Sequence, residues 1–281
     1  MTTTSPVGPG APLLAIENLT ITFPTPTGPV DVVKDLSVHL DAHSTLGIVG
    51  ESGSGKSMTS LAIMGLLPRG AQTSGSIRLN GHELLGQTDK QLRGIRGEKI
   101  AMVFQDPLSS LNPYYTVGLQ IEEMYRAHRG GSRKAARAVV IEALDRVKIK
   151  DAARRVDHYP HQFSGGMRQR IMIAMALCLQ PELLIADEPT TALDVTVQAQ
   201  ILELLADLKA ETGSGMVFIT HDLAVVSQVA EQLLVMKEGV VVERGPIEEV
   251  FSGPRHPYTR ALLAALPRID DPFENLKGVD A

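Results

Sequence analysis

The stretch Gly50-Glu51-Ser52-Gly53-Ser54-Gly55-Lys56-Ser57 decides how this chain folds. An apolar run with a strand pattern, Thr45–Val49, precedes it, and a helical pattern, Met58–Leu67, follows it. Between a strand and a helix, a loop of the form G-x-x-x-x-G-K-[ST] turns its backbone N–H groups toward a phosphate, and the positive helix N-terminus adds to the attraction. The stretch therefore predicts an α/β sheet with a nucleotide bound at the strand ends.

Every position of this loop has a use in holding a nucleotide. The glycines let the backbone turn tightly, so that successive N–H groups face the phosphates. We expect the Lys56 ammonium to reach the β- and γ-phosphates and the Ser57 hydroxyl to bind Mg²⁺. The residues assigned to nucleotide binding are Gly50, Ser52, Gly53, Ser54, Gly55, Lys56 and Ser57.

A second apolar run ends in two adjacent carboxylates, Asp187 and Glu188. Leu183–Ala186 has the pattern of a buried strand, and successive side chains of a strand point in opposite directions. The two carboxylates can therefore do different things. Asp187 is placed to hold the Mg²⁺ shell, and Glu188 to polarise the water that attacks the γ-phosphate. An isolated Asp-Glu pair would be read as a solvated acidic turn; the phosphate loop favours the functional interpretation.

Strand patterns alternate with helical ones along the chain. Besides the two runs above, Leu13–Phe23 and Met216–Thr220 are predicted strands. Between Thr88 and Ala176 the pattern is mainly helical, most clearly at Ala135–Val147, where apolar residues recur at three- and four-residue spacing. We expect a helical lobe inserted into the sheet domain. The predicted ranges are a flexible start at 1–12, a nucleotide-binding domain at 13–250 with the lobe at about 88–176, and a tail at 251–281.

Composition excludes several classes of protein. With 281 residues, 43% of them hydrophobic, the chain can bury a large core and is too apolar for disorder. No apolar run approaches the roughly 18 residues of a membrane span, and the start lacks a secretory signal pattern, so we expect a cytoplasmic location. A net charge of −5, with one short basic stretch that lacks aromatics, disfavours nucleic acid as a partner. The single cysteine, Cys178, allows no internal disulfide and is expected in the core.

The run Phe163-Ser164-Gly165-Gly166-Met167-Arg168-Gln169-Arg170 points to a family. It starts a predicted helix ahead of the acidic pair and resembles the signature sequence of the ATPases of ATP-binding cassette (ABC) transporters, with Met167 where a glutamine is usual. Taken alone, Ser-Gly-Gly before a helix is an ordinary cap. Further matches follow in the family's order, and the resemblance covers the chain from about residue 13 to residue 245. These matches are Gln105 after the apolar run Ile100–Phe104, Ala192-Leu193-Asp194, and His221.

The resemblance implies a P-loop NTPase fold, an α/β ABC cassette with a RecA-like sheet core and an inserted helical lobe. It also implies that two cassettes pair head to tail around two ATP molecules, each held by the phosphate loop of one subunit and by Ser164–Gly166 of the other. Gln105 is then expected beside the Mg²⁺ and the water, His221 at the γ-phosphate, and Asp194 at the subunit interface. Outside this family context, Gln105 and His221 would be read as a surface glutamine and a strand-end histidine.

Phe23 closes the first predicted strand and has two interpretations. It matches the position where this family usually stacks an aromatic ring on adenine, which adds affinity but little selectivity among bases. It could equally be a core residue at the end of the strand. Both interpretations stay open at the level of the sequence.

Three stretches resemble the oligopeptide and dipeptide import branch of the family: residues 104–113, 159–170 and 256–263. This branch implies a second, different ABC ATPase subunit, two membrane-spanning permease subunits and an external substrate-binding protein as partners. The chain is then expected as a peripheral protein on the cytoplasmic face of the cell membrane. Many relatives have a cysteine-rich tail with an iron–sulfur cluster; those cysteines are missing here, so no cluster is expected. Importers of nickel, glutathione, sugars or siderophores share much of this sequence and stay alternatives.

Two other classes of protein compete with a transport ATPase. A soluble ABC ATPase acting on ribosomes or chromosomes generally has two cassettes in one chain, or a long coiled coil between phosphate loop and signature. The sequence shows neither pattern. A nucleotide-binding module that has lost hydrolysis is disfavoured because Ser57, Gln105, Glu188 and His221 are all present.

Overall fold

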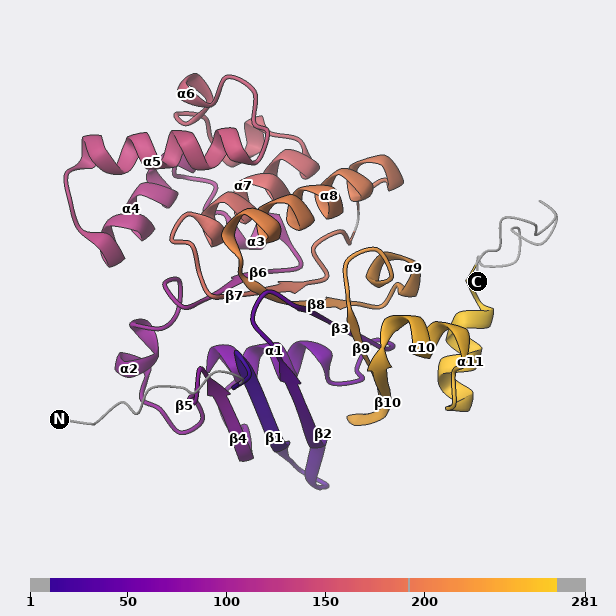
Figure 1. Ribbon diagram of the computed structural model, residues 1–281. Helices are drawn as coiled ribbons and strands as arrows, with labels where there is room; N and C mark the ends of the chain where they lie inside the picture. The colour runs from indigo at the N-terminus through magenta and orange to yellow at the C-terminus, as the bar shows by residue number, and fades with distance from the viewer. Residues whose placement is uncertain (1–10, 192, 267–281) are drawn as a thin grey trace, which may run out of the picture.

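The structure, a computed structural model, describes residues 11–191 and 193–266, apart from the side chain of Leu108. Its elements form three layers (Figure 1): an antiparallel sheet at the bottom of the view, a mainly parallel sheet in the middle and a group of helices at the top. The ranges predicted as a flexible start and as a tail lie partly outside the described residues. No helix within the described ranges is long and apolar enough to cross a membrane.

The middle sheet carries the predicted phosphate loop. Its strands run parallel to one another except at one edge, where the last strand is antiparallel. Because parallel strands end on the same side of a sheet, the loops that follow them gather there. Across the sheet, the strands are β10 (Val240–Pro246), β9 (Gln232–Lys237), β3 (Thr45–Val49), β8 (Gly215–Thr220), β7 (Leu183–Asp187) and β6 (Ile100–Val103).

The second sheet is antiparallel and lies below the first, with α1 (Lys56–Met64) between them (Figure 1). The long hairpin of its first two strands shows three register shifts. Ile63 of α1 is buried in one core with side chains of both sheets. Across this sheet, the strands are β2 (Gly28–Leu40), β1 (Leu14–Thr25), β4 (Gln72–Leu79) and β5 (His82–Glu83).

The helices above the middle sheet belong to a second core. Ile121, Leu144, Ile171 and Leu205, one from each of the four longest helices, are buried in it. These helices are α4 (Val117–Arg129), α5 (Arg133–Arg146), α7 (Gly165–Leu177) and α8 (Val195–Thr212). The shorter helices are α2 (Asp89–Arg93), α3 (Pro107–Ser110), α6 (Ala152–Arg155), α9 (Leu223–Val226), α10 (Ile247–Ser252) and α11 (Pro257–Ala264), with a 3₁₀ turn at Pro160–Gln162.

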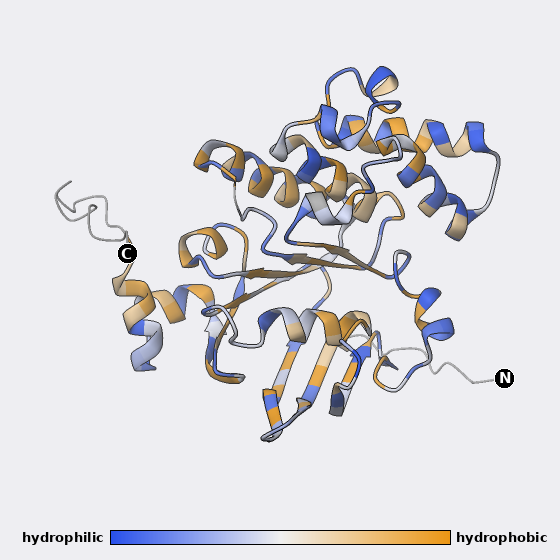
Figure 2. Cartoon of the chain, turned by 180° about the vertical axis from the view of Figure 1, so that it is seen from behind, coloured by the Kyte–Doolittle hydropathy of each residue, from blue (hydrophilic) through white to orange (hydrophobic). Residues whose placement is uncertain are grey.

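The central strands are apolar throughout because both of their faces are covered. On β8, Ile219 faces the lower core with α1, and Phe218 faces the upper core with the long helices. On β7, Ile185 likewise faces the lower core and Ala186 the upper core. Successive strand residues point to opposite faces, so a strand between two layers needs apolar side chains at every position. Figure 2 shows this hydrophobic colour along the middle sheet.

The predicted strands occur at nearly the expected places: β1, β3, β7 and β8 correspond to the four apolar runs. The range 88–176, for which mainly helices were predicted, also holds β6, a four-residue strand that pairs with β7. A run this short has no clear periodicity, so only its pairing with a buried neighbour makes it a strand. Cys178 is partly buried and packs against the upper core, as expected, and burial raises the pKa of its thiol to about 12.

Candidate functional site

The phosphate loop turns tightly between β3 and α1, and three of its glycines make the turn possible. Gly50, Gly53 and Gly55 have φ angles of 156°, 79° and 101°, in the region that favours glycine. A Cβ on Gly50 would lie 2.2 Å from the carbonyl oxygen of Met236, and one on Gly55 would lie 2.7 Å from that of Val32. Around Gly53 no heavy atom of the described chain lies within 4 Å of such a Cβ. The loop is therefore held closely by β9 and β2 on two sides and is open at Gly53.

Lys56 is buried and turned back into its own loop. Its Nζ donates to the carbonyl oxygens of Gly50, at 2.6 Å, and Glu51, at 2.9 Å. Burial lowers the pKa of Lys56, while the carboxylates of Glu188, Asp187 and Glu51 oppose that shift. The loop also holds the buried Ser54 Oγ, for which the described residues supply no hydrogen-bond partner, and α1 starts without a side-chain cap. Unused donors around a helix N-terminus and a buried ammonium fit an anion such as a polyphosphate.

Asp187, at the end of β7, faces this loop. Its two carboxylate oxygens accept hydrogen bonds from Ser57 Oγ, at 3.2 Å, and from Ser60 Oγ, at 3.3 Å. Burial raises the pKa of Asp187, and the two serine hydroxyls oppose the shift. A carboxylate beside a hydroxyl suits Mg²⁺, which is usually held by one or two carboxylates, waters and substrate phosphates. Within the described residues, no cluster of three or more His, Cys, Asp or Glu could hold a metal without such added ligands.

Glu188 follows β7 in a strained conformation and collects three partners. Its φ is 46°, a left-handed value that costs a non-glycine residue about 1–3 kcal/mol. Its backbone N–H donates to the carbonyl oxygen of Ile219, at 2.8 Å, which attaches it to β8. Its Oε2 accepts from Gln105 Nε2, at 3.0 Å, and Thr191 Oγ1, at 2.9 Å, and lies 3.4 Å from His221 Nδ1. The loops after three parallel strands thus converge on one carboxylate oxygen.

The adjacent carboxylates face different neighbours, as the sequence predicted. Asp187 is tied to the serines of α1, whereas Glu188 lies beside Gln105 and His221. The His221 side chain is 60% exposed and that of Glu188 is 15% exposed. The cluster therefore opens to solvent on the histidine side, where a substrate and a water can enter.

The signature segment lies in a different layer. Ser164 caps α7 as predicted, its Oγ accepting from the N–H of Met167 at 3.3 Å. A Cβ on Gly166 would lie 2.5 Å from Val197 Cγ1 of α8, whereas one on Gly165 would have an ordinary 3.8 Å contact with Leu193. The side chains of α7 belong to the upper core and those of α1 to the lower one, on opposite faces of the sheet. In the described part of the chain, no hydrogen bond joins Ser164–Gly166 to the phosphate loop.

Two further predicted residues, Phe23 and Asp194, form no hydrogen bond with Lys56 or Glu188 within the described chain. Phe23 pairs with Val30 near the turn of the β1–β2 hairpin and is half-buried against the lower core. Asp194 is exposed and caps α8, its carboxylate accepting from the N–H of Val197 at 3.0 Å. Ala192, named with it in the sequence match, lies outside the described residues. The roles assigned to these residues stay predictions.

The sequence reasoning missed three polar partners of the site. Ser60 and Thr191 each stand three residues after a predicted site residue, a spacing that puts them on the same helix turn or tight loop. Tyr258, on α11, accepts a hydrogen bond from the N–H of Glu51 in the phosphate loop, at 3.1 Å. Tyr258 lies in the stretch 256–263 that resembles the import branch, but no local pattern predicts its contact with the loop, 207 positions away in the sequence.

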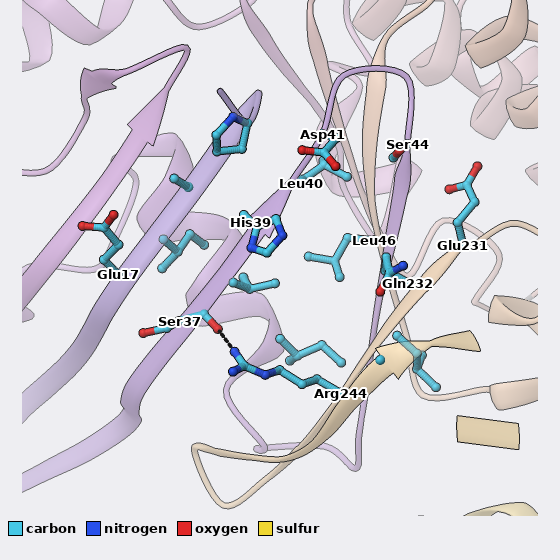
Figure 3. A pocket seen from close by; sticks show the side chains of 17 residues that line it. Glu17, Ser37, His39, Leu40, Asp41, Ser44, Leu46, Glu231, Gln232 and Arg244 are labelled. Atoms are coloured by element: carbon cyan, nitrogen blue, oxygen red, sulfur yellow. Dashed lines mark hydrogen bonds between the residues drawn. The ribbon is translucent and has the colours of Figure 1, made fainter. Parts of the chain in front are cut away.

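A large cavity of about 940 Å³ lies elsewhere, between β1–β2 and β9–β10. Figure 3 shows its lining of mixed charge, including Glu17, His39 and Glu231, and Arg244, whose guanidinium donates to the carbonyl oxygen of Ser37 at 2.9 Å. No residue of the phosphate loop lines this cavity. The phosphate loop and the Glu188 cluster instead lie at the carboxyl ends of the neighbouring parallel strands β3, β8 and β7.

Comparison with known proteins places this chain in a family. The ABC transporter family profile matches residues 33–191, and that of the oligopeptide/dipeptide transporter C-terminal region matches residues 242–280. The oligopeptide transport ATP-binding protein OppD of Haemophilus influenzae is 51% identical over 265 residues, which cover 94% of this chain and 82% of that protein.

Solved structures show the same fold. The ATP-binding cassette MJ0796, in a dimeric post-hydrolysis state bound to ADP and Pi, is 30% identical, with a TM-score of 0.74 over 83% of this chain and 98% of that one. The cbiO1 protein of Clostridium perfringens, part of the ABC transporter complex cbiONQ, is 28% identical, with a TM-score of 0.74 over 92% of this chain and 97% of that one. The predicted P-loop cassette fold is thereby confirmed. The chain belongs to the ABC transporter family, and it is an ATP-hydrolysing cassette of that family.

Proposed function

We propose that this chain is the ATPase subunit of a peptide importer. The observation that carries the proposal is the combination, in one chain, of a phosphate loop facing a complete acidic cluster with a C-terminal region of the oligopeptide/dipeptide transporter type. The similarity to OppD over nearly the whole chain supports peptides as the transported substrate. Nickel, glutathione, sugars and siderophores stay alternatives that the experiment below can reveal.

The site residues divide the work of hydrolysis. The loop N–H groups and the Lys56 ammonium hold the phosphates, and Ser57 and Asp187 supply oxygen ligands for magnesium. Magnesium, when bound, neutralises part of the phosphate charge. Glu188 Oε2 accepts the proton of the attacking water. Gln105 and His221 hold the Glu188 carboxylate oxygen in place. The strained backbone of Glu188 supports this role, since strain of this kind clusters at active sites.

The second half of the site comes from another cassette. Ser164–Gly166 start α7 at a helix N-terminus, which favours an anion, yet they lie on the face of the sheet opposite α1. A head-to-tail pair brings this segment to the partner's phosphate loop, with Asp194 at the interface. The dimeric MJ0796 cassette supports such a pair. We propose that the partner is a second, different ABC ATPase chain.

The permease subunits dock near Gln105 on the cytoplasmic face of the membrane. The chain after Gln105 presents large aromatic side chains to solvent, with Tyr114 84% and Tyr115 49% exposed. The Val117 N–H donates to the carbonyl oxygen of His158, at 2.9 Å, which brings Tyr159, also exposed, to the same region. Exposed aromatics gathered in this way are typical of protein interfaces. A permease seated here contacts the segment that carries Gln105 and so senses the Glu188 cluster.

The proposal is tested by purifying the chain from membranes with its natural partners and identifying them. We expect two permease chains, a second ATPase and MgATP hydrolysis that increases when a peptide-loaded binding protein is added. Lys56→Ala in the same complex should abolish tight ATP binding and hydrolysis, because the phosphates lose their buried positive charge. If the complex hydrolyses ATP in response to nickel or a sugar but not to peptides, the transported substrate is that compound and not a peptide. If Lys56→Ala hydrolyses ATP at the normal rate, the assignment of the ATP site to the phosphate loop is wrong.

A further inference from the structure

The C-terminal helix α11 contacts the phosphate loop from behind. The Tyr258 hydroxyl accepts a hydrogen bond from the backbone N–H of Glu51, at 3.1 Å, across 207 positions of sequence. Tyr258 is only 9% exposed and belongs to the upper core. A peptide N–H of the phosphate loop is therefore bound to a side chain of the C-terminal region and not directed at a phosphate.

The tyrosine ring is held by the strand that also supports the loop. Lys237 Nζ, at the end of β9, lies 5.1 Å from the centroid of the ring, a cation–π contact. In the turn that follows, the Gly239 N–H donates to the carbonyl oxygen of Ser54, at 3.1 Å. The turn between β9 and β10 and the Tyr258 hydroxyl thus hold the loop at two separate points, Ser54 and Glu51.

The start of α11 is itself fixed by a carboxylate of β10. Glu243 accepts hydrogen bonds from the N–H groups of Arg255, at 2.6 Å, and His256, at 3.0 Å. His256 caps the helix, its Nδ1 accepting from the N–H of Tyr258 at 3.2 Å. Partial burial opposes ionisation of Glu243, but these hydrogen bonds together lower its pKa, so the carboxylate is ionised at neutral pH and accepts both strongly. Tyr258 is therefore a rigidly placed group and not a chance surface contact.

One further hydrogen bond connects Tyr258 to the phosphate-binding lysine. The Glu51 residue that donates to Tyr258 also accepts, through its carbonyl oxygen, from Lys56 Nζ at 2.9 Å. A phosphate bound by the Lys56 ammonium competes with that carbonyl for its N–H groups, so the loop backbone then depends more on its other attachments. We propose that Tyr258 is a positioning residue for the phosphate loop, through which the C-terminal region sets the nucleotide affinity of its own subunit. This inference rests on the proposed function of the loop as the ATP site.

The test compares Tyr258→Phe with Tyr125→Phe in the full-length chain. Tyr258→Phe removes one oxygen and keeps the ring over Lys237; Tyr125, half-buried on α4 in the helical layer, loses the same atom away from the loop. Binding of the non-hydrolysable analogue Mg·AMP-PNP is measured by calorimetry, turnover is measured with the partner cassette present, and the melting temperature is recorded alongside. We expect Tyr258→Phe to raise Kd and KM by about 3- to 10-fold, the scale of one hydrogen bond. Its kcat should stay within about twofold of wild type, because bound phosphates then order the loop.

A second variant covers the case in which Tyr258→Phe is poorly folded. Glu243→Gln keeps Tyr258 but weakens the hydrogen bonds that place α11, and it should raise Kd in the same direction by a smaller factor. If both variants bind Mg·AMP-PNP as tightly as Tyr125→Phe, Tyr258 does not position the loop; a lower melting temperature with unchanged Kd shows a structural role alone and also overturns the inference. If the wild type itself fails to bind the analogue, the proposed function is wrong, which is a distinguishable result.

Discussion

The phosphate-loop half of the site and the signature half differ in how completely one chain builds them. Around the phosphate loop, Lys56, Asp187 and Glu188 each have partners from the loop itself or from other elements. The carboxyl ends of the parallel strands bring these three residues together. Around the signature, within the described chain, Ser164 bonds only to its own helix and Gly166 packs on Val197 of α8. The first half is a preorganised site; the second is a capped helix N-terminus exposed toward solvent.

This difference indicates where each half does its work. A group that acts on the reacting atoms needs a fixed position, which supporting contacts supply. A group that closes the site needs only a stable surface to offer to its partner. Hydrolysis can therefore be removed from the phosphate-loop half without preventing closure, whereas changes at the signature should affect pairing. Substitutions at three places test this division, beginning with the one of largest expected effect.

Glu188→Gln should separate closure from hydrolysis. The amide is nearly isosteric but cannot accept the proton of the water, and loss of a general base typically costs about 10²- to 10⁴-fold in rate. Lys56, Ser57 and Asp187 still hold MgATP, so the variant with its partner cassette should stay as an ATP-dependent closed pair. The measurements are phosphate release and light scattering with MgATP.

Glu142→Gln on α5 is the matched control, an exposed carboxylate on the helical layer that should leave the rate unchanged. Two results would contradict the proposed division between the two halves of the site. A Glu188→Gln rate above about a tenth of normal would mean that this carboxylate is not the base. An inactive variant that never forms the closed pair would mean that the signature half does not meet a loaded phosphate loop.

Gly166→Ala and Gly165→Ala form a matched pair that tests the signature half. A Cβ added at Gly166 would lie 2.5 Å from Val197 Cγ1, and overpacking of this kind typically costs about 1–3 kcal/mol. A Cβ added at Gly165 has an ordinary contact at 3.8 Å. We therefore expect a lower melting temperature and weaker ATP-dependent pairing for Gly166→Ala, and near-normal stability for Gly165→Ala.

Equal melting temperatures for these two variants would show that α7 and α8 shift apart at little cost. If Gly165→Ala is stable yet fails to pair, the Gly165 N–H approaches the phosphate closely. That result would assign phosphate contact to Gly165 and helix packing to Gly166. Sedimentation of each variant with its partner cassette and MgATP gives the pairing constant.

The parts of the fold that the sequence predicted are those specified locally. Short local patterns of about ten residues specify two segments, the loop from β3 to α1 and the end of β7. Their positions and partners therefore followed from the motif and the strand pattern. β2, β4, β5 and β6 were not predicted. Register shifts interrupt the pairing of β2 and β4 with β1, and β5 and β6 are too short to show a period. The contacts of Thr191 and Tyr258 depend on backbone turns and on packing between distant segments, which no single-sequence pattern encodes.

Phe23→Ala gives the smallest expected effect and decides between two interpretations of one residue. Phe23 lies at the end of the β1–β2 hairpin, whose second strand contacts the phosphate loop through Val32, and its ring is only half-buried. Loss of one aromatic stack should weaken MgATP binding by about 1 kcal/mol, roughly fivefold, with nearly normal turnover at saturation. Because stacking is tolerant of the base, ATP and GTP should lose affinity alike.

Phe23→Tyr keeps the stack and should bind as wild type does. A melting temperature that falls steeply in Phe23→Ala, with Kd unchanged, identifies Phe23 as a core residue and moves adenine recognition elsewhere.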